Sequence, residues 1–160
     1  MLYEKDFLAW TQQQSELIRQ GRWQEVDLDH LIEEFEDMGK SNHWELESQL
    51  VVLLAHLLKW EFQLNQLQDQ WREFDERSWR KTIIEQRVQI ERLLEDRPSL
   101  SSHFETILQQ AYPTALRFAC KETQLDSLLF PSECPYSPKQ LLNEDFMPES
   151  RWFLNQIGCF

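Results

Sequence analysis

Residues 51–58 have the sequence VVLLAHLL, and His56 is the only polar side chain among them. A helix that is apolar nearly all round belongs in the interior of a folded protein. Apolar residues continue at helical spacing on both sides, and the inner face would consist of Leu46, Leu50, Leu53, Leu57 and Trp60. We therefore expect a helix from about residue 41 to residue 63 as the central and most enclosed element.

Four other segments have the amphipathic pattern of helices, at about residues 3–20, 27–38, 78–95 and 99–119. Asp27 is a suitable N-cap for the second of these, and Gly39 favours a break after it. The helix can also continue through Gly39 at a cost of about 1 kcal/mol relative to alanine. In this segment the expected buried stripe consists of Leu28, Leu31, Ile32, Phe35 and Met38.

Short loops between amphipathic helices predict an all-α fold, an antiparallel bundle of four to five helices. Three prolines in residues 131–138 predict an irregular C-terminal segment, with at most one short helix that has Ser137 as N-cap and Pro138 at its first position. We expect one domain over residues 1–148 and a tail over 149–160. Trp152, Phe153 and Leu154 in this tail would pack on the bundle or contact another chain.

The net charge of the chain limits the kinds of partner that it can bind. The formal net charge is −12, and residues 1–70 contain 14 acidic and 5 basic side chains. Such a surface repels phosphate backbones, so we expect no nucleic-acid partner and consider a basic protein as the partner. No apolar run approaches the ~20 residues of a membrane span, so we expect no membrane association.

The three cysteines, Cys120, Cys134 and Cys159, are far apart and are interpreted as free thiols in a reducing cytoplasm.

Polar residues at unusual helical positions indicate a candidate site. On a helical wheel, His30, Glu34 and Asp37 share a face that points away from the apolar stripe. Arg87 and Gln86 fall inside the apolar stripe of their own segment, with Arg80 at its edge. A buried arginine requires a partner, and residues 27–38 contain the densest group of carboxylates.

We therefore predict that Arg87, and with it Arg80, pairs with Glu33, Glu34 or Asp37. His56, in its apolar helix, is interpreted as a hydrogen-bonded core histidine. The complete candidate network is His30, Glu33, Glu34, Asp37, His56, Arg80, Gln86 and Arg87.

A metal site is the alternative interpretation of the histidines. His30, Glu34 and His56 have the ligand types that zinc, manganese or iron accept when facing helices bring them together. The sequence contains no HExxH motif, no GxSxG motif and no glycine-rich phosphate loop. We therefore assign no catalytic residue and expect no cofactor.

The chain resembles a bacterial family known as domain of unknown function 29 (DUF29). The resemblance covers about residues 3–148 and rests on six segments: YEKDFLAW at 3–10, DLDHLIEEFEDMG at 27–39, LLAHLLKW at 53–60, SWRKTIIEQR at 78–87, RPSL at 97–100 and PSECPYS at 131–137. The resemblance implies an all-helical bundle and implies no activity. The most recognisable polar positions of the family are occupied in this sequence by Asp27, His30, Glu33, Glu34, His56, Lys59, Arg80, Gln86 and Arg87.

Two functional hypotheses follow from these patterns. The first is a cytoplasmic, non-enzymatic interaction or binding module in which the polar residues form a structural network. The alternative is a metal-dependent or acid–base enzyme that uses His30, Glu34 and His56. The sequence leaves open the partner or substrate, the oligomeric state and the role of the tail.

Overall fold

The computed structural model describes residues 1–67 and 69–151, and all regular secondary structure in these residues is helical. The chain divides into two compact units, Met1–Asn42 (unit 1) and His43–Phe160 (unit 2). The single domain expected over residues 1–148 stays a prediction, because compactness does not test whether the units fold separately. The expected packing of Trp152, Phe153 and Leu154 lies outside the described residues.

Unit 1 is made of short helices and the first part of a long one, and Trp10 is buried in it. Helices α1 (Leu2–Lys5) and α2 (Phe7–Arg19) are followed by the 3₁₀ turn η1 (Trp23–Glu25) and by the beginning of α3 (Leu28–Phe62). Asp6 caps α2 by accepting a hydrogen bond from the amide of Ala9 at 2.9 Å. Gly21 follows α2 with φ of +71°, a backbone conformation that an L-residue adopts only with strain.

Helix α3 is continuous through Gly39, so the two helices expected at 27–38 and 41–63 are one helix of 35 residues. A β-carbon added at Gly39 would have no atom within 4 Å. Nothing in the described chain therefore packs against Gly39. The helix tolerates this glycine because the cost of one glycine, about 1 kcal/mol, is small against the many hydrogen bonds on either side.

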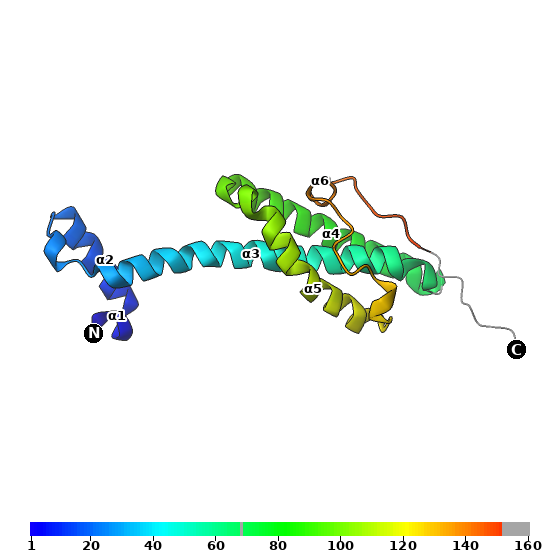
Figure 1. The fold of residues 1–160 in the computed structure, drawn as a ribbon, viewed down its shortest axis with the longest axis horizontal. Coiled ribbons are helices and arrows are strands. Elements are labelled where there is room, and N and C mark those ends of the chain that lie inside the picture. The colour runs from blue at the N-terminus through cyan, green and yellow to red at the C-terminus, as the bar shows by residue number, and fades with distance from the viewer. Residues whose placement is uncertain (68, 152–160) are drawn as a thin grey trace, which may run out of the picture. The chain divides into compact units, whose positions relative to one another are not determined.

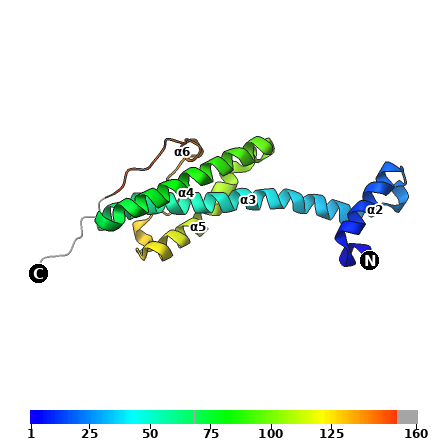
Figure 2. The ribbon, with the colours of Figure 1, turned by 180° about the vertical axis from the view of Figure 1, so that it is seen from behind.

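Unit 2 is a helical bundle made by the second part of α3, by α4 (Asp69–Asp96) and by α5 (Phe104–Thr123) (Figures 1 and 2). The connecting turns are η2 (Leu64–Gln66) and η3 (Pro98–His103). After α5 come η4 (Ser127–Leu129) and the short helix α6 (Pro138–Leu141). The all-α prediction is confirmed, whereas α4 begins nine residues earlier than the expected Ser78.

The core of unit 2 is built around the apolar part of α3. Leu46, Leu50, Leu53 and Leu57 are fully buried, which confirms that this part is the most enclosed. Helix α6 also begins as expected, with Ser137 and Gln140 forming a capping box ahead of Pro138. In the described part of the chain, no helix combines the length and the hydrophobicity needed to cross a membrane.

Candidate functional site

The eight predicted network residues fall into both units. Four of them, His30, Glu33, Glu34 and Asp37, lie on the part of α3 in unit 1. The other four, His56, Arg80, Gln86 and Arg87, lie in unit 2. Each group has its own partners within its unit.

His30 belongs to a hydrogen-bonded cluster that joins α2 to α3. Its Nδ1 donates to the carboxylate of Asp27 at 2.7 Å, and Asp27 also accepts a hydrogen bond from Trp10 Nε1 at 3.3 Å. The amide of Asp27 donates to Gln14 Oε1 at 2.8 Å. Burial alone would raise the pKa of Asp27, but the hydrogen bonds from His30 and Trp10 outweigh it and lower this pKa.

Tyr3 closes the same cluster from α1. Its hydroxyl donates to Glu34 Oε1 at 2.5 Å, and its ring lies 4.1 Å from the ring of His30. The hydrogen bond to the Glu34 carboxylate, together with burial and nearby negative charge, raises the pKa of Tyr3 to about 12. Every polar group named in this cluster has a partner in unit 1, so the arrangement is well suited to holding α1 and α2 on α3.

The remaining two acids of the predicted network in unit 1 are exposed. Asp37 forms an ion pair with Lys40 at 2.9 Å, one turn further along α3, and more than half of each side chain is exposed. Glu33 is also exposed. These carboxylates contribute charge to the surface rather than a buried pair.

His56 is a half-buried histidine held by its own helix. Its Nδ1 donates to the main-chain oxygen of Val52 at 2.8 Å. Burial lowers its pKa below the ordinary value. His56 and His30 lie on the single helix α3, 26 residues or about seven turns apart, so facing helices do not bring them together. Among residues 1–67 and 69–151, no group of three His, Cys, Asp or Glu side chains is arranged to hold a metal ion.

Arg87 is buried, as its helical position predicts, but its hydrogen-bond partners are main-chain oxygens. Nε donates to Leu141 O at 3.0 Å and Nη1 donates to Glu144 O at 3.2 Å. The guanidinium also lies over the ring of Phe146, at 5.9 Å from its centroid. The predicted pairing of Arg87 with Glu33, Glu34 or Asp37 is therefore replaced by contacts with the C-terminal segment.

Arg80 and Gln86, the other two predicted network residues on α4, have different contacts from Arg87. Arg80 lies over the ring of Trp60 at 4.9 Å and forms an ion pair with Glu76 at 3.6 Å. The Oε1 atom of Gln86 is buried and has no hydrogen-bond partner in the described part of the chain.

A second polar cluster, not predicted from the sequence, fastens the C-terminal segment to the end of α3. Buried Glu61 accepts hydrogen bonds from the hydroxyl of Tyr136 and from Nε of Arg151, each at 2.7 Å. The side chain of Asn65 donates to Ser150 O at 2.8 Å. Together with Arg87, these contacts hold residues 136–151 along the bundle.

Lys59 is the other buried charge near the end of α3. Its Nζ donates to Glu122 on α5 at 2.5 Å and lies 5.4 Å from the ring centroid of Trp79. Lys59 and Glu61 could have been found in the sequence in the same way as Arg87, because each is a charged residue within an apolar stretch of helix.

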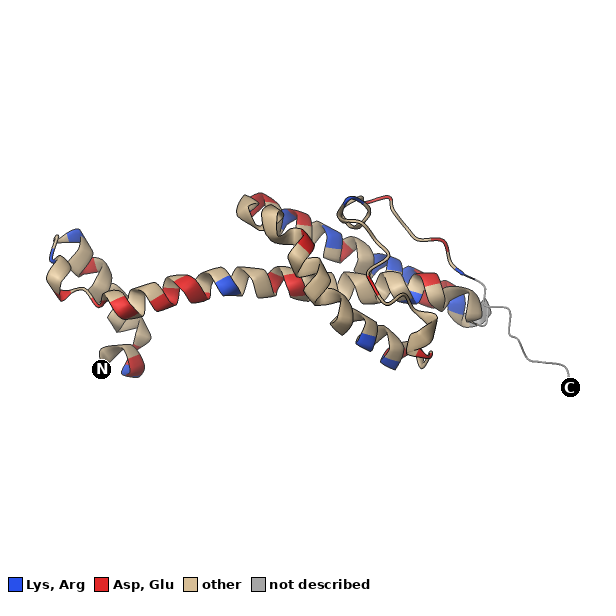
Figure 3. Cartoon of the chain, viewed as in Figure 1, with Lys and Arg blue, Asp and Glu red and all other residues tan. Residues whose placement is uncertain are grey.

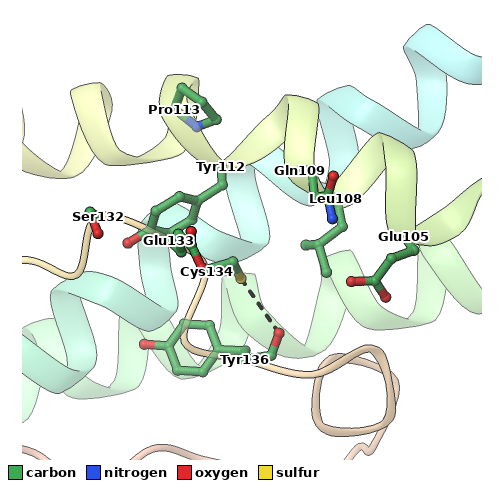
Figure 4. A pocket seen from close by; sticks show the side chains of 9 residues that line it. All are labelled: Glu105, Leu108, Gln109, Tyr112, Pro113, Ser132, Glu133, Cys134 and Tyr136. Atoms are coloured by element: carbon green, nitrogen blue, oxygen red, sulfur yellow. Dashed lines mark hydrogen bonds between the residues drawn. The ribbon is translucent and has the colours of Figure 1, made fainter.

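A pocket of about 420 Å³ opens between α5 and the segment 132–136 (Figure 4). Tyr112 and Glu105 line it from the helix, and Cys134 faces them from the segment. Burial raises the pKa of the Cys134 thiol, and its Sγ donates to Tyr136 O at 3.5 Å. Burial also raises the pKa of Cys120, so neither thiol is activated as a nucleophile. Both are free cysteines, as expected, whereas Cys159 lies outside the described residues.

Four of the five residues of the expected buried stripe of unit 1 are instead exposed, and the fifth, Leu31, is half-buried. Leu28, Ile32 and Phe35 are 57%, 55% and 66% exposed. Together with Gly39 they recur at i, i+4, i+7 and i+11 on one side of α3, and we define these four residues as the α3 stripe. The reason for the difference is that Tyr3 and Trp10 contact the opposite, polar side of α3, through Glu34 and Asp27.

A groove of about 360 Å³ between α2 and α3 borders the α3 stripe. It is lined by Phe7, Trp10, Thr11, Gln14, Ser15, Ile18, Leu31, Glu34, Phe35 and Met38. Phe35 belongs to both features, so the groove and the stripe form one continuous apolar surface within unit 1.

A known family matches most of the chain. The family model described as "Domain of unknown function DUF29" matches residues 2–147 of the 160-residue chain. No curated protein and no solved structure matched the chain.

Proposed function

This chain belongs to the DUF29 family, and we propose that it is a protein-interaction module whose α3 stripe and adjoining groove bind a basic amphipathic helix. The observation that carries this proposal is the exposure of Leu28, Ile32 and Phe35 on one side of α3. Met38, at the edge of the groove, is 64% exposed. Contiguous apolar surface of this kind is typical of an interaction site.

The spacing of the stripe supports a helical partner. Side chains at i, i+4 and i+7 form the seam along which a second helix packs. Gly39 extends this seam by one turn, and nothing in the described chain occupies the space beside it. A glycine at this position allows the backbone of a partner helix to approach closely, which explains a residue that the fold of the chain itself does not require.

The charge around the stripe supports a basic partner. Residues 1–42 contain ten acidic and four basic side chains. Figure 3 shows that acidic residues predominate along the first part of α3. On a helical wheel, Glu36 and Asp29 border the stripe on the side away from the groove. Lysine or arginine on the flanks of the partner helix would complement these carboxylates, and a second copy of this acidic chain would be repelled.

We propose that the protein works in the cytoplasm and that its partner is not a nucleic acid. Cys120 and Cys134 are free thiols, as is usual in a reducing cytoplasm. The net charge of −12 argues against nucleic acid as the partner.

The test is binding of a synthetic helical peptide of roughly 18 residues, or five turns, with leucine on one face and lysine on the other. Fluorescence anisotropy should show micromolar binding to the full chain. The double variant Ile32→Ser/Phe35→Ser should weaken this binding at least about tenfold, the equivalent of 1.4 kcal/mol.

Two controls make the result specific. The variant Ile84→Ser/Val88→Ser removes two apolar side chains of α4, each 49% exposed, and should leave the affinity unchanged. A peptide with glutamate in place of lysine should bind at least about tenfold more weakly. Equal loss in both double variants would overturn the proposal, as would self-association of the chain, in analytical ultracentrifugation, that depends on Ile32 and Phe35.

A further inference from the structure

His43 and His103 place their imidazole rings against each other in unit 2. His43 lies on α3, and His103 is the last residue of η3. Their ring centroids are 4.9 Å apart and their planes are inclined by 45°. His43 is half-buried and His103 is exposed, so a small ion can reach the pair from solvent.

The hydrogen bonds of His103 determine which ring nitrogen is available. Its Nδ1 lies 3.1 Å from Ser99 O, and a main-chain oxygen can only accept a hydrogen bond. The hydroxyl of Ser102 also donates to Ser99 O, at 2.8 Å, which leaves its oxygen able to accept from the same Nδ1, 3.0 Å away. Nδ1 therefore carries the proton in the neutral ring, and Nε2 presents its lone pair. Metal-binding histidines are commonly oriented by such a hydrogen bond to a main-chain oxygen.

The separation of the two rings matches that of two imidazoles on one metal ion. A metal–nitrogen bond of about 2.0–2.1 Å places each ring centroid about 3.2 Å from the metal. Two rings are then about 4.5 Å apart at a right angle between bonds and about 5.2 Å apart at a tetrahedral angle. The observed 4.9 Å lies between these two values.

We propose that His43 and His103 form a two-histidine site for a divalent ion from nickel to zinc in the first transition row. Imidazole nitrogen is a preferred ligand of these ions. The described residues contain no group of three His, Cys, Asp or Glu side chains suited to a metal, so water completes the coordination. The ion would link α3 to η3, and the site is independent of the α3 stripe.

Isothermal titration of the tag-free 160-residue chain with Ni²⁺ tests this site. The wild type should bind one ion per chain. His43→Ala and His103→Ala should each weaken binding at least about tenfold, because each leaves a single imidazole. His56→Gln removes a histidine elsewhere in unit 2 and should leave the affinity within about twofold, well below that tenfold loss.

The same titration can overturn the site. Absence of Ni²⁺ binding to the wild type, or a variant of His43 or His103 that retains wild-type affinity, would do so. If either variant fails to fold by circular dichroism, the wild type is titrated with Ni²⁺ and observed by NMR. Paramagnetic broadening of the His43 and His103 ring signals before those of His30 and His56 supports the site, and any other order overturns it.

Discussion

Arg151 is joined to Glu61 twice, by its main chain and by its side chain. The amide of Arg151 donates to Glu61 O at 2.7 Å, and its Nε donates to Glu61 Oε1 at 2.7 Å. The carboxylate of Glu61 is 7% exposed, whereas the side chain of Arg151 is 57% exposed. Glu61 is therefore the buried acceptor at which α3, Tyr136 and Arg151 meet.

Replacing Glu61 by alanine should destabilise unit 2 by about 2–3 kcal/mol, because the buried hydroxyl of Tyr136 then loses its acceptor. Glu61→Gln keeps an acceptor oxygen and should cost about 1 kcal/mol or less, since Arg151 is largely solvated. Urea unfolding followed by circular dichroism measures both. Glu73→Ala, which removes an exposed ion pair with Arg77, should change stability by less than about 0.5 kcal/mol. Equal effects of Glu61→Ala and Glu73→Ala would contradict this account.

Arg87→Lys should loosen the segment around α6. A lysine keeps the charge but lacks the planar group that reaches Leu141 O and Glu144 O together. We expect a loss of about 2–3 kcal/mol and faster amide exchange in residues 138–147, measured by mass spectrometry. Arg92→Lys, at an exposed position of the same helix, is the control and should leave exchange unchanged.

Gly39→Ala should stabilise α3 by about 1 kcal/mol, because the new methyl group meets no atom and alanine has the higher helix propensity. Gly21→Ala should do the opposite and cost about 1 kcal/mol or more, since φ at Gly21 is +71°. Thermal unfolding of the two variants measures the contrast. A destabilising Gly39→Ala would show that the helix is interrupted there.

Tyr3 should ionise about two pH units above a free tyrosine, since its pKa is raised to about 12. Because the raised pKa favours the neutral hydroxyl in the folded state, the resulting stability is complete below pH 10. It is lost as the pH rises from about 10 through 12. Absorbance at the tyrosinate band, compared between the wild type and Tyr3→Phe, measures this ionisation. A Tyr3 that titrates near pH 10 would contradict the hydrogen bond to Glu34.

His56 should remain neutral below the pH at which a free histidine becomes protonated. Its pKa is lowered by burial, so the folded state binds fewer protons than the unfolded state. The corresponding stability is present above about pH 6.5 and is lost as the pH falls from there through the lowered pKa. NMR titration of the ring protons, assigned with His56→Gln, measures the value. A pKa at or above the ordinary one would contradict the burial of this ring.

The helices were predictable because their apolar periodicity is strong, but two of their boundaries were not. The break expected at Gly39 is absent because one glycine costs too little to stop a helix that is well supported on both sides. The start of α4 at Asp69 was missed because residues 69–77 are mostly polar. A polar helical turn does not differ from a loop in its hydrophobic pattern.

The candidate site was only partly predictable for a different reason. The position of Arg87 in an apolar stripe correctly predicted that it is buried and needs partners. Those partners are main-chain oxygens, which every residue has, so no side chain in the sequence could identify them. For the α3 stripe, periodicity identified the apolar side of the helix but not which side α2 would cover. The contacts of Tyr3 and Trp10 with Glu34 and Asp27 decide that point.

The continuity of α3 has a consequence for the order of folding. Forming the first turn of a helix is unfavourable, and isolated helices shorter than about 12–15 residues are marginal in water. Because many of residues 46–62 are buried in the core of unit 2, we expect them to become ordered with that core and to provide the helical nucleus. Residues 28–42 can then form by propagation from this nucleus, one hydrogen bond at a time, and give α2 a surface on which to fold. Amide protection along α3 should accordingly be highest in residues 46–62 and decrease toward Leu28.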